Sequence, residues 1–122
     1  MRVNLCYTLN SNATDLKELK MKTYKFYADP GHGWLAVKIE ELMQLGIITQ
    51  ISAYSYMRGA TAYLEEDVDA SLFFEAYKDK TGRYPEHTYK HTNNRSPIRN
   101  YDSYNRNKAV DFALVALSSG TI

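Results

Sequence analysis

A chain of 122 residues is long enough for one domain with a hydrophobic core. Its net charge of +1 argues against a protein that coats nucleic acid, and no run of apolar residues approaches the roughly 18 that a membrane span needs. The single cysteine, Cys6, excludes an internal disulfide framework and fits a reducing cytoplasm. The charge is uneven, because residues 79–108 carry seven Lys or Arg against three Asp or Glu, whereas residues 21–78 carry five against eight. We therefore expect the positive field in the second half of the chain.

Residues 1–20 are expected to form an N-terminal arm outside the folded domain. They are polar and show no clear amphipathic period. The codons for Lys17-Glu18 can read AAGGAG, a bacterial ribosome-binding sequence, shortly upstream of Met21. A start at Met21 would make residues 1–20 a mis-annotated leader, and a genuine but poorly ordered arm is the alternative. Residues 21–122 are predicted to form a single domain.

From Met21 onward the pattern predicts an α+β fold, with a small antiparallel sheet and packed helices. Polar and apolar residues alternate over Lys22–Tyr27, so that Tyr24 and Phe26 share one face of a half-buried strand. The further strands are expected over Trp34–Val37, within the apolar stretch Ile47–Tyr56, over Thr61–Leu64 after a turn at Arg58-Gly59, and over Tyr84–His91. The helices are expected over Lys38–Leu45 ending at Gly46, over a segment with the apolar stripe Leu72, Phe73, Ala76 and Tyr77 ending at Gly82, and over Asn107–Leu117.

Two features of the helices leave alternatives open. The C-terminal helix is apolar on most sides, so it is either part of the core or a contact between subunits. The acidic run Glu65–Asp69 resembles a metal-binding segment, but it lacks the glycine and the distal glutamate of a calcium loop. We interpret it as the start of a helix, with Asp67 or Asp69 as the cap.

The catalytic candidates are weak. Asp29 and His32 lie three residues apart in a Gly-rich turn, where they could act as an acid–base pair or bind a metal, although a turn histidine is more often held by a nearby carboxylate. His87 and His91 lack a third ligand at a diagnostic spacing. We expect no enzyme activity, no cofactor and no metal site.

The strongest binding signal is the segment Asn93–Tyr101. It places Arg95 and Arg99 four residues apart, with Asn93 and Asn94 beside them. Guanidinium groups match the oxygens of a phosphate, and amides can bind a ribose or a base edge. The alternative is a solvated polar loop.

Aromatic side chains near the predicted hairpin add to this signal. Tyr54 and Tyr56 share a strand face and could stack on a base, with Arg58 next to them. Tyrosines at this spacing are more often core or cross-strand pairs, and that interpretation also stays open.

Four motifs carry a resemblance to a known family: Phe26–Leu35 (FYADPGHGWL), Tyr54-Ser55-Tyr56, Leu64–Ala70 and Ser96–Arg99. The segment from Met21 to Tyr104 resembles the bacteriophage anti-Thoeris family, type 1. The resemblance implies a phage protein of the host cytoplasm that binds and sequesters a nucleotide immune signal without degrading it. That signal would be a glycocyclic ADP-ribose isomer or, in some members, a cyclic di- or trinucleotide. It further implies a homo-oligomer with pockets at subunit contacts. From the balanced charge, the lack of a recognition-helix motif and the lack of a long apolar run, we expect no membrane, DNA or RNA partner.

For such a ligand we assign roles from side-chain chemistry. Arg95 and Arg99 would clamp phosphate oxygens, with Arg58 or Arg106 contributed by a neighbouring subunit. Asn93 and Asn94 would bind ribose hydroxyls or adenine, and Tyr56, Phe73 or Phe74 would stack on the base. Two other classes remain alternatives, namely an enzyme that degrades the signal and a small inhibitor that binds a host protein.

Overall fold

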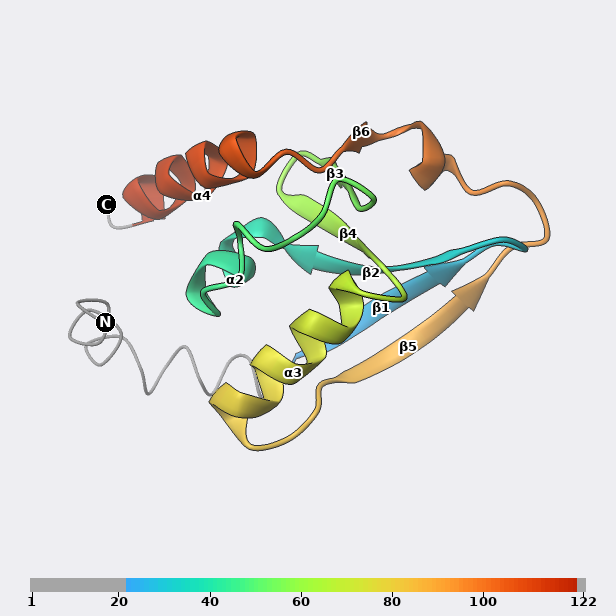
Figure 1. The fold of residues 1–122 in the computed structure, drawn as a ribbon, viewed down its shortest axis with the longest axis horizontal. Helices are drawn as coiled ribbons and strands as arrows, with labels where there is room; N and C mark the ends of the chain where they lie inside the picture. The colour runs from blue at the N-terminus through green and yellow to red at the C-terminus, as the bar shows by residue number, and fades with distance from the viewer. Residues whose placement is uncertain (1–21, 121–122) are drawn as a thin grey trace.

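A hairpin of β1 (Thr23–Ala28) and β2 (Gly33–Lys38) lies within the sheet, between β5 and β4 (Figure 1). The computed structural model describes residues 22–120, and the predicted arm, residues 1–20, lies outside this range. The six described strands are ordered β5-β1-β2-β4-β3-β6. The other strands are β3 (Tyr56–Arg58), β4 (Thr61–Glu65), β5 (Glu86–His91) and β6 (Asp102–Ser103). The predicted α+β class is confirmed.

The sheet is mixed rather than antiparallel, which corrects one part of the prediction. β1 and β5 run parallel, with Thr23 opposite Glu86 and Ala28 opposite His91, whereas the other neighbouring pairs are antiparallel. The cause is the helix α3 (Asp69–Thr81) between β4 and β5. This helix carries the chain back along the sheet, so that β5 begins at the same end as β1 (Figure 1).

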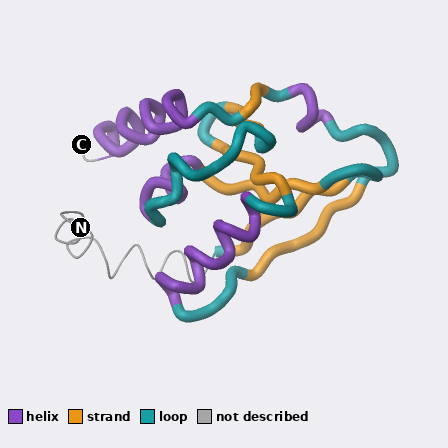
Figure 2. The backbone as a smooth tube through the Cα atoms, in the orientation of Figure 1, coloured by secondary structure: helices purple, strands orange, loops and turns teal. Residues whose placement is uncertain are grey.

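The helices pack on one face of this sheet (Figure 2). Besides α3 these are α2 (Ile39–Gln44) and α4 (Arg106–Gly120), and α4 packs against α2. Inward-facing residues of β1, β2 and β4 form one core with all three helices. Its fully or nearly fully buried members include Tyr24, Leu35, Val37, Leu42, Leu64, Phe73, Tyr77, Ala109 and Ala113. None of the described helices is long and apolar enough to cross a membrane.

The C-terminal helix α4 is core on one side and exposed on another. Ala109 and Ala113 are fully buried, which accounts for part of its apolar character. Leu114 and Val115, in contrast, are 53% and 66% exposed. The alternative of a subunit contact therefore applies only to this exposed side.

The acidic run before α3 acts differently from the prediction. Neither Asp67 nor Asp69 caps the helix, because its N-cap position is Val68 and has no side-chain cap. Instead, Glu65 accepts hydrogen bonds from the backbone N–H groups of Asp67 and Val68 at 2.8 and 3.1 Å. Asp69 points into the protein. These carboxylates therefore organise the turn that leads into the helix.

The buried Asp69 also explains why Ile47–Ser55 is not a strand. Asp69 Oδ2 accepts from the backbone N–H and the hydroxyl of Ser52, at 3.0 and 2.7 Å, and from the hydroxyl of Ser55 at 2.5 Å. The Ser55 carbonyl accepts from Tyr104 N–H at 2.8 Å. These bonds hold the segment as a series of turns, and β3 starts only at Tyr56.

The segment 92–101 passes around the end of the sheet on its way from β5 to β6. These two strands lie at opposite edges, so the chain has to travel the full width of the sheet. It does so beside the turn between β1 and β2, and contains the short 3-10 helix η1 (Pro97–Asn100) (Figure 1). The two arginines predicted to bind ligand lie in this segment.

Candidate functional site

Asp29, in the turn between β1 and β2, binds the segment that contains η1. Asp29 is 5% exposed, and its carboxylate accepts hydrogen bonds from the backbone N–H groups of Gly31, His32 and Ser96 at 3.0, 3.0 and 2.9 Å. Arg99 completes the set, with Nε donating to Oδ2 at 2.7 Å and Nη2 donating to Oδ1 at 2.9 Å. The hydrogen bond from Arg99, followed by that from Ser96, holds the pKa of Asp29 well below its ordinary value of 3.8.

This geometry gives the acid–base interpretation of Asp29 and His32 no support. A general acid or base needs a pKa near the working pH, whereas Asp29 stays ionised and already has donors on both oxygens. His32 meets Asp29 through its backbone N–H. Within residues 22–120, no group of three or more His, Cys, Asp or Glu side chains could hold a metal ion.

A first hollow lies beside the Asp29–Arg99 pair. The Arg99 guanidinium lies over the Trp34 ring at 5.4 Å, and Trp34 contacts Tyr56 and His32 with ring centroids 6.1 and 6.2 Å apart. The volume of the hollow is about 310 Å³, and its remaining lining residues are Tyr54, Glu65, Asp67 and Val68. Because Asp29 neutralises Arg99 and two more carboxylates lie nearby, this hollow attracts an anion only weakly.

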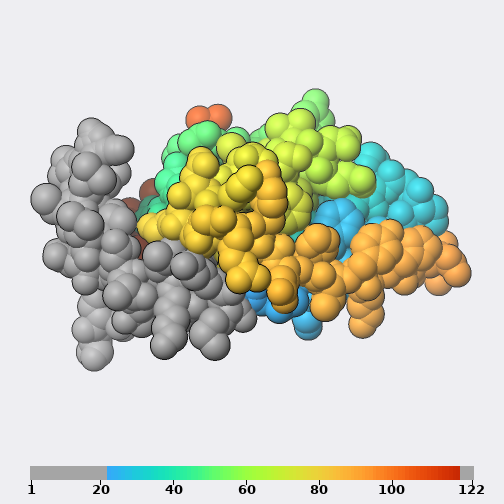
Figure 3. Space-filling model, turned by 90° about the horizontal axis from the view of Figure 1, so that it is seen from below, coloured from blue at the N-terminus to red at the C-terminus, as the bar shows by residue number. Residues whose placement is uncertain are grey.

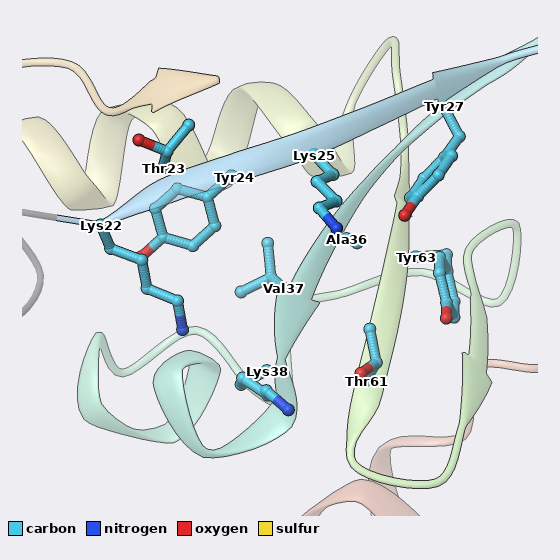
Figure 4. Close-up of a pocket in the computed structure, with 10 residues that line it drawn as sticks. All are labelled: Lys22, Thr23, Tyr24, Lys25, Tyr27, Ala36, Val37, Lys38, Thr61 and Tyr63. Carbon is cyan, nitrogen blue, oxygen red and sulfur yellow. The ribbon is translucent and has the colours of Figure 1, made fainter. Parts of the chain in front are cut away.

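The second hollow lies on the sheet face opposite the helices, which we call the open face. Strand alternation places Lys25 and Tyr27 of β1 on this face, and the strand register puts Ala36 of β2 next to Lys25 and Tyr63 of β4 on the other side of Ala36. Lys38 and Thr61 follow at the next position along β2 and β4. The volume of this hollow is about 310 Å³. In Figure 4 the ammonium group of Lys25 ends beside Ala36, and the side chains of Tyr27 and Tyr63 lie to the right of it.

A third hollow, of about 300 Å³, adjoins the second because both are lined by Tyr27 and Tyr63. Lys90 of β5 and Tyr101 line its other side. Tyr101 packs against Tyr63 with ring centroids 5.1 Å apart, and the guanidinium of Arg58 lies 4.9 Å from the Tyr101 ring. We call the second and third hollows together the open-face groove.

Four of the cations around this groove, Lys25, Lys38, Arg58 and Lys90, have no carboxylate partner among the described residues, whereas Lys22, which also lines the second hollow, is paired with Glu41. Three ion pairs form in this part of the chain: Lys22 with Glu41, Arg83 with Glu86, and Arg99 with Asp29. None of them includes Lys25, Lys38, Arg58 or Lys90. The groove therefore combines positive charge that is free to meet an anion with phenol rings that can stack on a base.

The predicted site residues are distributed over several places. Arg99 and Tyr56 meet at the first hollow, and Arg58 reaches the open-face groove through Tyr101. Arg95 is exposed and donates to the side-chain oxygen of Asn100 at 2.9 Å, instead of joining Arg99.

Three further predicted residues are also exposed, namely Asn93, Asn94 and Arg106, the first residue of α4. None of these three lines a hollow described above.

Phe73 is wrongly placed in the site. It is fully buried, and Tyr24, Phe74 and Tyr77 surround it with ring centroids 5.1 to 6.2 Å away. A base could reach the ring only if the core opened. The apolar stripe that predicted the helix α3 was the correct explanation of this residue.

Lys25 and Lys38 line the open-face groove but were not among the residues expected in the site. The alternation in β1 put Lys25 and Tyr27 on the exposed face, which was the available signal. The pairing of Lys38 with Thr61, however, depends on the register between β2 and β4, and no local pattern encodes it.

These features define a small α+β protein with helices on one face of a mixed sheet and an aromatic, cationic groove on the other. Comparison of the chain with family models, with curated proteins and with solved structures finds no match.

Proposed function

We propose that this protein is a phage-encoded inhibitor of bacterial immunity that binds a nucleotide second messenger and sequesters it without degrading it. The observation that supports the proposal is the open-face groove, where Lys25 and Lys38 stand without carboxylate partners on the same face as Tyr27 and Tyr63. A cyclic ADP-ribose isomer carries a pyrophosphate, riboses and an adenine, and these three groups match the lysines, hydroxyls and phenol rings in turn.

In this proposal Lys25 and Lys38 bind the pyrophosphate. Ammonium groups on long side chains meet a phosphate as point charges, and both lysines are exposed and so accessible to a ligand. The adenine stacks on Tyr63 or Tyr101, an interaction that contributes about 1–3 kcal/mol per base. The guanidinium of Arg58 also contacts the Tyr101 ring.

Sequestration places a demand on affinity. An inhibitor of this kind has to bind below the signal concentration that activates the host effector, so we expect nanomolar affinity, which corresponds to about −12 kcal/mol. The groove is open on one side, and a small ligand reaches such affinity only when most of its surface is enclosed. A second subunit that covers the groove would supply this enclosure.

The test is capture of the ligand from cells. The purified protein is incubated with extract from bacteria whose TIR defence has been triggered, washed and denatured by heat, and the released molecules are identified by mass spectrometry. We expect an intact cyclic ADP-ribose isomer or cyclic nucleotide. A cleaved product would instead indicate an enzyme that degrades the signal, and an empty protein would favour an inhibitor that acts on a host protein.

A further inference from the structure

The strand β5 forms one edge of the described sheet and is exposed along its whole length. It pairs with β1 on one side, and no described strand pairs with its other side. All six of its residues are exposed, and Tyr89 is 65% exposed. Figure 3 looks onto this edge, where β5 and the segment after it form the orange surface to the right of α3. An exposed edge strand of this length is a template for pairing with another strand.

The hydrogen bonds of β5 determine which of its backbone groups are free. Thr92, just after the strand, donates its N–H to the carbonyl of Ala28 in β1 at 2.9 Å. Because the N–H and C=O of one residue point to the same side of a strand and alternate along it, the even-numbered residues bond to β1. The outward-facing backbone groups therefore belong to His87, Tyr89 and His91.

These free groups restrict how two copies of β5 could pair. In an antiparallel pair related by a two-fold axis, outward-facing residues have to face each other in order to exchange hydrogen bonds. The axis must then pass through a residue rather than between two residues. An axis at Thr88 pairs His87 with Tyr89 of the second copy, twice, and covers residues 86–90 of each strand. An axis at Tyr89 would cover residues 87–91 instead, so the backbone permits both registers and the side chains decide between them.

The side chains favour the register with the axis at Thr88. An axis at Thr88 places Glu86 opposite Lys90 of the second copy, and the symmetry repeats this pair. Both lie at positions between the hydrogen-bonded pairs, where side chains approach most closely. An axis at Tyr89 would instead put Lys90 opposite Thr88, and neither of the two Glu86–Lys90 ion pairs would form. Lys90, which would otherwise block edge-to-edge contact, thus gains a carboxylate partner.

The surroundings of β5 are compatible with this contact. The present partner of Glu86 is Arg83, at 3.7 Å between two exposed side chains, which is a weak interaction that can be replaced. On the helix side, Tyr89 stacks on Phe26 with ring centroids 5.8 Å apart, and its exposed part would lie against His87 of the second copy. Beside this position is a hollow of about 250 Å³ that is lined in part by Tyr84 and Pro85.

We propose that the protein forms a dimer through antiparallel pairing of β5 with β5 of a second copy, with the two-fold axis at Thr88. The two sheets then become one continuous sheet, with both helical layers on the same side. The two open faces also lie side by side, with both copies of Lys90 near the axis. This inference rests on the edge geometry and the charges of β5, and is independent of any ligand.

Charge reversal with rescue tests the proposal. Glu86→Lys puts two lysines opposite each other at both pairs, and Lys90→Glu does the same with two glutamates. We expect sedimentation velocity to show a dimer for the wild type and at least a tenfold weaker dimer for each single variant. The double variant Glu86→Lys/Lys90→Glu restores opposite charges, as does an equimolar mixture of the two single variants, and both should dimerise like the wild type.

Circular dichroism of each variant serves as the control for folding. All the altered side chains are exposed and none belongs to the core, so we expect unchanged spectra. A wild type that stays monomeric at high concentration would overturn the proposal. So would single variants that dimerise as tightly as the wild type, or a mixture of the single variants that remains monomeric.

Discussion

Arg99 forms a two-pronged ion pair with Asp29, a residue 70 positions earlier in the chain. The pair joins the segment 92–101 to the turn between β1 and β2 and places the Arg99 guanidinium over Trp34. Ser96 N–H donates to the same carboxylate at 2.9 Å. Asp29 is therefore the residue that fixes the path of the chain around the end of the sheet.

Replacement of Asp29 should loosen this segment while leaving the core in place. In Asp29→Asn the amide cannot accept all the donors that the carboxylate now accepts, so we expect faster amide hydrogen exchange over residues 92–101 and unchanged protection in β2. Arg95→Gln is the matched control, because Arg95 is exposed and bonds only to Asn100. Equal exchange in the wild type and in Asp29→Asn would contradict this role of Asp29.

The lowered pKa of Asp29 predicts how stability depends on pH. Folding favours the ionised carboxylate of Asp29. Its contribution to the free energy of unfolding is therefore complete above the ordinary pKa of 3.8 and is lost as the pH falls below that value. We expect the midpoint of urea unfolding to fall between about pH 5 and about pH 3. The fall should be smaller in Asp29→Asn, which has no carboxylate to protonate. Parallel pH profiles for the two proteins would exclude Asp29 as the source.

Tyr104 should stabilise the protein through one buried hydrogen bond. Its hydroxyl donates to the carbonyl of Ile48 at 2.6 Å, at the junction between the 47–55 turns and the start of α4. Tyr104→Phe removes the donor and leaves this carbonyl unpaired, so we expect a loss of about 1–2 kcal/mol in the free energy of unfolding. Urea unfolding of the wild type and of Tyr104→Phe measures this loss, and an unchanged midpoint would show that the hydrogen bond to Ile48 does not stabilise the protein.

Gly33 should not tolerate a larger residue. A methyl group there would lie 2.5 Å from two carbon atoms of the Phe26 ring. Since Phe26 is itself packed against Tyr89, we expect Gly33→Ala to cost about 1–3 kcal/mol of stability. Gly46 provides a contrast, because nothing lies near a methyl group there and the cost of Gly46→Ala arises only from its φ of +76°. Full stability of Gly33→Ala would show that Phe26 moves aside freely.

The local elements were predictable because their signals are local. The alternation over Lys22–Tyr27 identified β1 and its buried face, and Gly82 ends α3 with a φ of +89° as its position suggested. The parallel pairing of β5 was not predictable, since it depends on where α3 delivers the chain. In the same way, Arg99 looked like a free phosphate ligand because its partner Asp29 lies 70 residues away.

The central claim is that the open-face groove binds a nucleotide signal, and calorimetry of a cyclic ADP-ribose isomer tests it most directly. The variant Lys25→Gln/Lys38→Gln removes two cations from the groove. Its control, Lys78→Gln/Lys80→Gln, removes the same charge from the last turn of α3 on the other side of the sheet. We predict nanomolar binding to the wild type and the control, and at least about tenfold weaker binding to the groove variant. Equal affinity for both variants, or no binding to the wild type, would contradict the claim.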